Sequence, residues 1–63
     1  MKRSVLLRHL RRHGCILKRE GRSHSLWENQ QNGHTETITR HTEIPNRLAK
    51  KICLSLALPE PAG

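Results

Sequence analysis

The chain has 63 residues, a length that fits one small domain and leaves no room for a second. Only 33 % of the residues are apolar, and no run approaches the roughly 20 apolar residues that a membrane-spanning helix needs. Twelve Lys and Arg oppose five Asp and Glu, so the formal net charge is +7. A basic excess of this size predicts a polyanion, such as a nucleic acid, or an acidic protein as the partner.

The first predicted element is a helix over residues 5–13, with Ser4 as its cap. Its apolar face consists of Leu6, Leu7 and Leu10. Gly14 follows at the position where a left-handed residue often ends a helix. The apolar run at the start stops at Arg8, which is too early for the core of a secretory signal peptide, so we expect a cytoplasmic protein.

Three strands are expected next, over residues 15–20, 24–28 and 35–39. The alternation of the second strand places Ser25 and Trp27 on one face and His24 on the other. Trp27 is the only aromatic residue among Phe, Trp and Tyr, and we expect it to pack in the core, with stacking on a base as the alternative. A polar loop with the turn signal Asn32-Gly33 separates the second and third strands.

The last predicted element is a helix that begins either with Pro45 in its first turn or with Asn46 as its cap. Its apolar stripe consists of Leu48, Ala49, Ile52, Cys53 and Leu56. We therefore expect one α+β domain over residues 1–58, in the order α-β-β-β-α, with two helices packed on one face of a three-stranded antiparallel sheet. Residues 59–63 cannot continue a helix and are expected to form a flexible tail.

Cys15 and Cys53 lie among apolar neighbours, and two cysteines are too few for a secreted disulfide framework. We expect buried free thiols in a reducing compartment. His9 and His13, four residues apart on the first helix, could chelate a metal together with Cys15. A zinc site normally uses four ligands in paired spacing, and the chain has no Cys-x-x-Cys pair, so we expect neither a metal nor another cofactor.

The stretch from Arg19 to Trp27 carries the main candidate site. It contains Gly21 in a polar turn, and His24 where this turn meets the next strand. An imidazole can donate or accept a proton near neutral pH, and the flanking Arg19 and Arg22 would attract phosphate. RNA chemistry is one interpretation of this pattern, and a surface turn with an incidental histidine is the other.

Four short motifs, taken in chain order, carry a resemblance to a known family. They are Met1-Lys2-Arg3 with a helix ending in Gly14, Leu17-Lys18-Arg19-Glu20-Gly21, Gly21-Arg22-Ser23-His24, and Arg40-His41-Thr42-Glu43-Ile44 leading into Leu48-Ala49-Lys50-Lys51-Ile52. In this order and spacing they resemble the HicA (YcfA-like) family of small mRNA interferase toxins, which HicB antitoxins neutralise. The family often has proline where this chain has Thr39.

The resemblance implies a fold similar to the double-stranded RNA-binding domain and cleavage of mRNA by one catalytic histidine, which here is His24. We expect His24 to act as general base or general acid on a substrate whose own 2′-hydroxyl is the nucleophile. The products would be a 2′,3′-cyclic phosphate and a free 5′-hydroxyl, formed without a metal. The implied partners are mRNA and a HicB-like acidic antitoxin, with no membrane and no small-molecule cofactor.

The residues expected to contact RNA are Lys18, Arg19, Arg22, Ser23 and Arg40. The basic residues before His24 could instead form a solvated strand end, and the serine could simply complete the turn. His41 is an auxiliary candidate that would supply a second proton or orient the loop before the last helix. Gly21 is the other auxiliary candidate because it shapes the turn. Two alternatives to a nuclease stay open: a non-catalytic RNA-binding module, and an inactive toxin that still binds its antitoxin.

Overall fold

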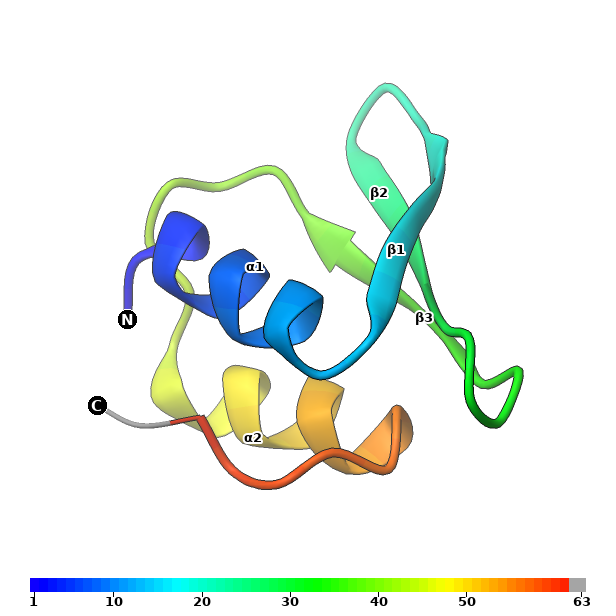
Figure 1. The fold of residues 1–63 in the computed structure, drawn as a ribbon. Coiled ribbons are helices and arrows are strands. Elements are labelled where there is room, and N and C mark those ends of the chain that lie inside the picture. Colours follow the sequence, from blue (N-terminus) through cyan, green and yellow to red (C-terminus); the bar gives the residue numbers. More distant parts are fainter. Residues whose placement is uncertain (62–63) are drawn as a thin grey trace.

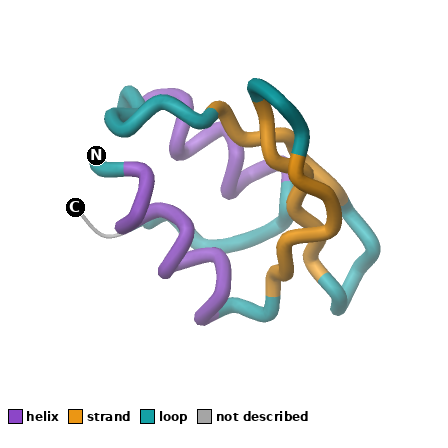
Figure 2. The backbone as a smooth tube through the Cα atoms, turned by 90° about the horizontal axis from the view of Figure 1, so that it is seen from above, coloured by secondary structure: helices purple, strands orange, loops and turns teal. Residues whose placement is uncertain are grey.

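The computed structural model describes residues 1–61 and confirms the α-β-β-β-α order (Figure 1). The elements are α1 (Arg3–Arg12), β1 (Cys15–Glu20), β2 (His24–Asn29), β3 (Thr35–Thr39) and α2 (Asn46–Ser55). The strands form one antiparallel sheet in the order β1-β2-β3. Both helices lie on the same side of this sheet, as the two perpendicular views of Figures 1 and 2 show, and the opposite face is open.

The start of α1 differs from the prediction, because Lys2 and not Ser4 is the cap, and the Lys2 side chain makes no capping bond. A distant segment supplies the missing partner instead. The backbone N–H of Arg3 donates to the carbonyl of Thr42 over 2.8 Å, so the loop after β3 satisfies one of the free donors of the helix. The predicted end is confirmed, since Gly14 has a φ of +87°.

The alternation predicted for β2 is confirmed, and the strand is one residue longer. Ser25, Trp27 and Asn29 are buried against the helices, and His24 is exposed. Trp27 is only 1 % exposed and therefore cannot stack on a base. The guanidinium of Arg11 covers its ring, 5.1 Å from the centroid. The core formed around Trp27 consists of Leu6, Leu7, Leu10, Cys15, Ile38, Ile44, Ala49, Ile52, Cys53 and Leu56.

The start of α2 also differs from both predicted alternatives. Pro45 is the cap, outside the first turn, and Asn46 is the first helical residue. The Asn46 side chain accepts a hydrogen bond from the amino group of Met1 over 3.0 Å, so it ties two chain segments together and does not cap the helix. The apolar stripe is buried as predicted, except that Leu48 is half-buried.

The described part of the predicted tail returns along the domain. The carbonyl of Pro59 lies 3.0 Å from Nε2 of His9, and the backbone N–H of Leu58 donates to the carbonyl of Cys53. Residues 62–63 of the predicted flexible tail lie outside the described residues. Within residues 1–61, no helix has the length and apolar character that crossing a membrane requires.

Both cysteines are buried and free, as predicted. Burial raises the pKa of the Cys15 thiol. Burial, with Cys15 and Glu60 nearby, raises the pKa of Cys53 from 9.0 to about 11. These thiols are neutral in the folded protein at physiological pH, which suits a role in packing.

Candidate nucleic-acid site at the β1–β2 turn

The turn between β1 and β2 closes tightly around Gly21. The backbone N–H of Gly21 donates to the carbonyl oxygen of His24 over 2.8 Å. A Cβ at position 21 would lie 2.7 Å from that same oxygen. Positive φ angles occur at Gly14 and Gly33 but not at Gly21. Close approach of two backbone segments, and not the conformational freedom expected from the sequence, is therefore what requires glycine here.

His24 combines a fixed backbone with a free side chain. In the sheet register His24 lies opposite Thr39. The neighbouring residues, Arg40 and Ser23, form the backbone hydrogen bond (N–H to carbonyl, 3.3 Å), so His24 and Thr39 are a non-hydrogen-bonded pair. In such pairs the side chains approach closely. The imidazole is exposed, and neither ring nitrogen has a hydrogen-bond partner within residues 1–61. Its nitrogens are therefore accessible to a ligand.

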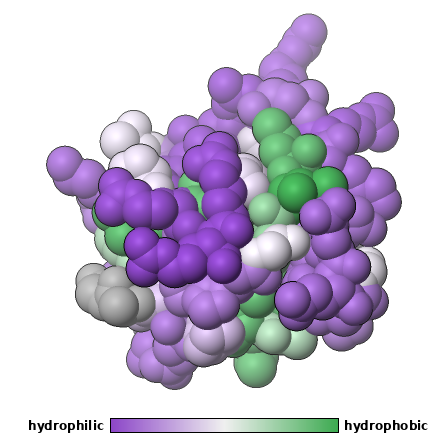
Figure 3. Space-filling view, in the orientation of Figure 1, coloured by the Kyte–Doolittle hydropathy of each residue, from purple (hydrophilic) through white to green (hydrophobic). Residues whose placement is uncertain are grey.

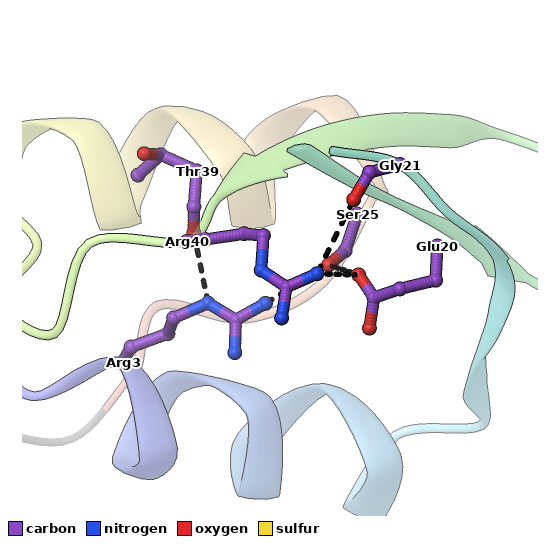
Figure 4. A network of polar contacts seen from close by, with 6 residues as sticks. All are labelled: Arg3, Glu20, Gly21, Ser25, Thr39 and Arg40. Carbon is purple, nitrogen blue, oxygen red and sulfur yellow. Dashed lines mark hydrogen bonds and ion pairs between the residues drawn. The ribbon is translucent and has the colours of Figure 1, made fainter. Parts of the chain in front are cut away.

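Arg3, at the start of α1, donates hydrogen bonds to two residues that adjoin His24 (Figure 4). Its Nε donates to the carbonyl of Thr39 over 2.8 Å, and its Nη2 donates to Oγ of Ser25 over 3.0 Å. Thr39 lies opposite His24 in the register and Ser25 follows it in the chain. Arg3 thus fixes the ends of β2 and β3 relative to each other where they carry the histidine.

A carboxylate links this contact to the turn. Oγ of Ser25 also donates to the carboxylate of Glu20, which lies opposite it in the β1–β2 register. Oε1 of Glu20 is 3.3 Å from Nη1 of Arg40, and the same nitrogen donates to the carbonyl of Gly21 over 3.2 Å (Figure 4). The Arg40 side chain is 50 % exposed, and its other N–H groups have no partner within the described residues. Arg40 therefore supports the turn and keeps donors for a phosphate.

Sequence reasoning did not identify Arg3, Glu20 and Ser25 as parts of the site, although the sequence contains an indication for two of them. A cation in the first turn of a helix is opposed by the helix dipole, so its placement there indicates a partner elsewhere. Ser25 shares the inward face of its strand with Trp27, and a buried hydroxyl needs a hydrogen-bond partner. Nothing in the sequence indicated Glu20.

The other predicted contact residues are divided between two places. Ser23 and Arg22 lie in the exposed turn beside His24. Lys18 lies at an irregularity in β1 and pairs with Glu28 at 3.5 Å on the open face of the sheet. His41 is exposed after β3, and its backbone N–H donates to Oγ1 of Thr39 over 3.4 Å. The turn between β1 and β2 and the segment after β3 are therefore the two parts of the chain that meet at His24.

Most of the positive charge is uncompensated. Of the twelve Lys and Arg side chains, only Lys18 and Arg40 lie within 4.0 Å of a carboxylate within residues 1–61. Arg19 and Arg22 are exposed and belong to the uncompensated set. The surface is accordingly hydrophilic over much of the view in Figure 3, with a hydrophobic patch over β1, where Ile16 and Leu17 are exposed. A field of this sign attracts phosphate to the turn.

His9 and His13, the two histidines of the first helix, lie close together in the structure. The rings of His9 and His13 lie 4.5 Å apart between centroids, and Nε2 of His9 faces the carbonyl of Pro59. The described part of the chain contains no group of three His, Cys, Asp or Glu side chains arranged to hold a metal ion.

Comparisons with known proteins give no identification. No protein-family model matches the chain, and neither a curated protein nor a solved structure matches it at a significant level. The resemblance to the HicA family therefore depends on the motifs in the sequence alone.

Proposed function

We propose that the protein is an endoribonuclease, the toxin of a type II toxin–antitoxin system, and that His24 is its catalytic residue. The observation that carries this proposal is the exposed, unpartnered imidazole of His24 on a backbone that Gly21 and Arg3 hold in place. General acid–base catalysis needs a proton-transfer group that is both accessible and fixed in position. An incidental surface histidine would not need such support from a residue that lies far away in the sequence.

In the proposed reaction the 2′-oxygen of the RNA attacks the adjacent phosphorus, and the bond to the 5′-oxygen breaks. The 2′-hydroxyl loses its proton to a base, and the departing 5′-oxygen gains one from an acid. His24 performs one of these transfers, and the exposed His41 is the candidate for the other. Arg22 and the free donors of Arg40 would stabilise the charge that develops on the phosphate.

The partners proposed with this function are mRNA and an acidic antitoxin of the HicB type, and the proposed location is the cytoplasm. Uncompensated charge at the turn supports both partners, because an acidic inhibitor that covers His24 would use the field that attracts RNA. Arg19 and Arg22, exposed and without a carboxylate nearby in the described chain, equally suit a non-catalytic RNA-binding module. Cleavage itself separates the two functions.

The test is cleavage of a short RNA by the purified protein, followed by analysis of the product ends. A 2′,3′-cyclic phosphate and a 5′-hydroxyl are expected, and a 2′-deoxy sugar at the cleaved position should block the reaction. His34→Ala is the matched control, because His34 is an exposed histidine in the loop at the opposite end of β2. If wild-type protein binds the RNA and leaves it intact, the binding module is the correct assignment.

A further inference from the structure

A groove of about 200 Å³ lies beside His24, between the free edge of β3 and α2. Its walls are formed by His24, Glu36, Thr37, Thr39, Leu48, Lys51 and Ile52. Typical small-molecule pockets enclose about 300–1,000 Å³, so this groove fits one flat ring system better than a whole cofactor. Leu48 and Ile52 supply apolar surface, and Lys51 supplies a positive charge.

The edge of β3 presents backbone hydrogen-bonding groups to this groove. Because the His24–Thr39 pair is non-hydrogen-bonded, the N–H and C=O groups of Thr37 and Thr39 point away from β2. Two of these four groups already have partners. The Thr37 N–H donates to Oε2 of Glu36 over 3.0 Å, and the Thr39 carbonyl accepts from Arg3. The Thr37 carbonyl and the Thr39 N–H have no partner within residues 1–61.

This pattern favours a nucleobase over an added protein strand. A strand that extended the sheet would need both groups of each edge residue, and Glu36 and Arg3 block one group on each. What remains is one acceptor and one donor, two residues apart on an extended strand. The edge of an unpaired base offers a donor beside an acceptor, which is how proteins read single-stranded RNA.

We propose that this groove binds an unpaired nucleobase of the RNA next to the cleaved phosphate. The inference rests on the proposed function for the position of that phosphate at His24. The Thr37 carbonyl accepts from the base, the Thr39 N–H donates to it, and Leu48 contacts its face. Oε1 of Glu36 adds a second acceptor, so bases with an exocyclic amino group bind better than uracil.

The test uses nucleoside 3′-monophosphates and wild-type protein, with the Thr39 amide followed by NMR. We expect 3′-AMP to shift the NMR resonance of this amide. 3′-UMP should bind about tenfold more weakly, because it makes one good hydrogen bond fewer. Inorganic phosphate should leave the Thr39 amide unchanged. Equal or tighter binding of 3′-UMP, or the same shift with phosphate alone, would overturn the proposal. A shift that grows with protein concentration alone would show that two copies pair through this edge, and would also overturn it.

The matched variants are Thr39→Pro and Thr35→Pro. Proline removes the donor to the groove at position 39, whereas position 35 begins the same edge strand and does not line the groove. Proline is tolerated on edge strands and at strand starts. We expect about tenfold weaker 3′-AMP binding for the first variant only, and equal loss in both would contradict the inference. Nucleotide binding without RNA cleavage would refute the nuclease function but support the base site. Cleavage without nucleotide binding would support the nuclease function and refute the base site.

Discussion

Gly21→Ala is the substitution for which the structure gives the clearest magnitude. The new Cβ would meet the His24 carbonyl at 2.7 Å, and that oxygen belongs to backbone that cannot move aside without opening the turn. Overpacking of this kind costs about 1–3 kcal/mol. Loss of the Gly21–His24 hydrogen bond adds about 0.5–1.5 kcal/mol. A domain of this size has only about 3–5 kcal/mol of core stability, so the variant should be markedly less stable.

The same substitution should impair catalysis beyond its effect on folding. Opening the turn displaces the backbone of His24, and a displacement of about 1 Å in a catalytic group can lower the rate about 100-fold. We expect at least that loss in RNA cleavage, measured at low temperature on protein that circular dichroism shows to be folded.

Gly33→Ala is the control, because it strains the backbone at the other end of β2. Gly33 has a φ of +77° and open space around it, so alanine there costs about 1–2 kcal/mol without touching His24. Urea unfolding should show both variants destabilised, and only Gly21→Ala should lose cleavage. The reasoning is refuted if Gly21→Ala unfolds and cleaves like wild type, or if the two variants lose cleavage equally.

Three further predictions concern other parts of the domain. Arg3→Ala should destabilise the protein by about 1–3 kcal/mol and lower kcat, because both acceptors of Arg3 lose a charged donor. Arg8→Ala, on the exposed face of α1, should change neither stability nor kcat. Equal effects of the two substitutions would contradict the positioning role of Arg3. Arg22→Ala should lower the slope of log affinity for single-stranded RNA against log salt by about 0.7, and an unchanged slope would mean that this side chain contacts no phosphate. Burial raises the pKa of Cys53 from 9.0 to about 11. Between these pH values the folded protein keeps a proton that the unfolded chain loses, so the free energy of unfolding should fall as the pH rises. Cys53→Ala should flatten that decline in urea titrations, and an identical decline would refute the assignment.

The sequence predicted the features that depend on local pattern. The strands over residues 15–20 and 35–39 are confirmed, as is the inward face of β2 with Ser25 and Trp27. Alternation and helical spacing decide which side chains are buried, and these signals extend over only a few residues. The buried stripe of α2 followed for the same reason.

Most of the errors and omissions involve contacts between residues that are distant in the sequence. Both predicted helix starts were wrong, and each start makes a contact with a distant segment. The Arg3 N–H of α1 donates to the Thr42 carbonyl, and the Asn46 side chain of α2 accepts from the Met1 amino group. Arg3 reaches acceptors 22 and 36 residues away, and no local pattern encodes such a pairing. Gly21 shapes the turn for a different physical reason from the one expected. Its role depends on the approach of the His24 carbonyl, which only the folded sheet reveals.

The central claim, that His24 is the catalytic residue of a ribonuclease toxin, is tested most directly in growing cells. Wild type, His24→Ala and His34→Ala would each be expressed from an inducible promoter, with growth and mRNA integrity measured in the same cultures. We predict arrest and fragmented mRNA for the wild type and His34→Ala, and normal growth with intact mRNA for His24→Ala at equal protein level. Arrest with fragmented mRNA in all three cultures would show that His24 is the wrong residue, and intact mRNA in all three would contradict the nuclease.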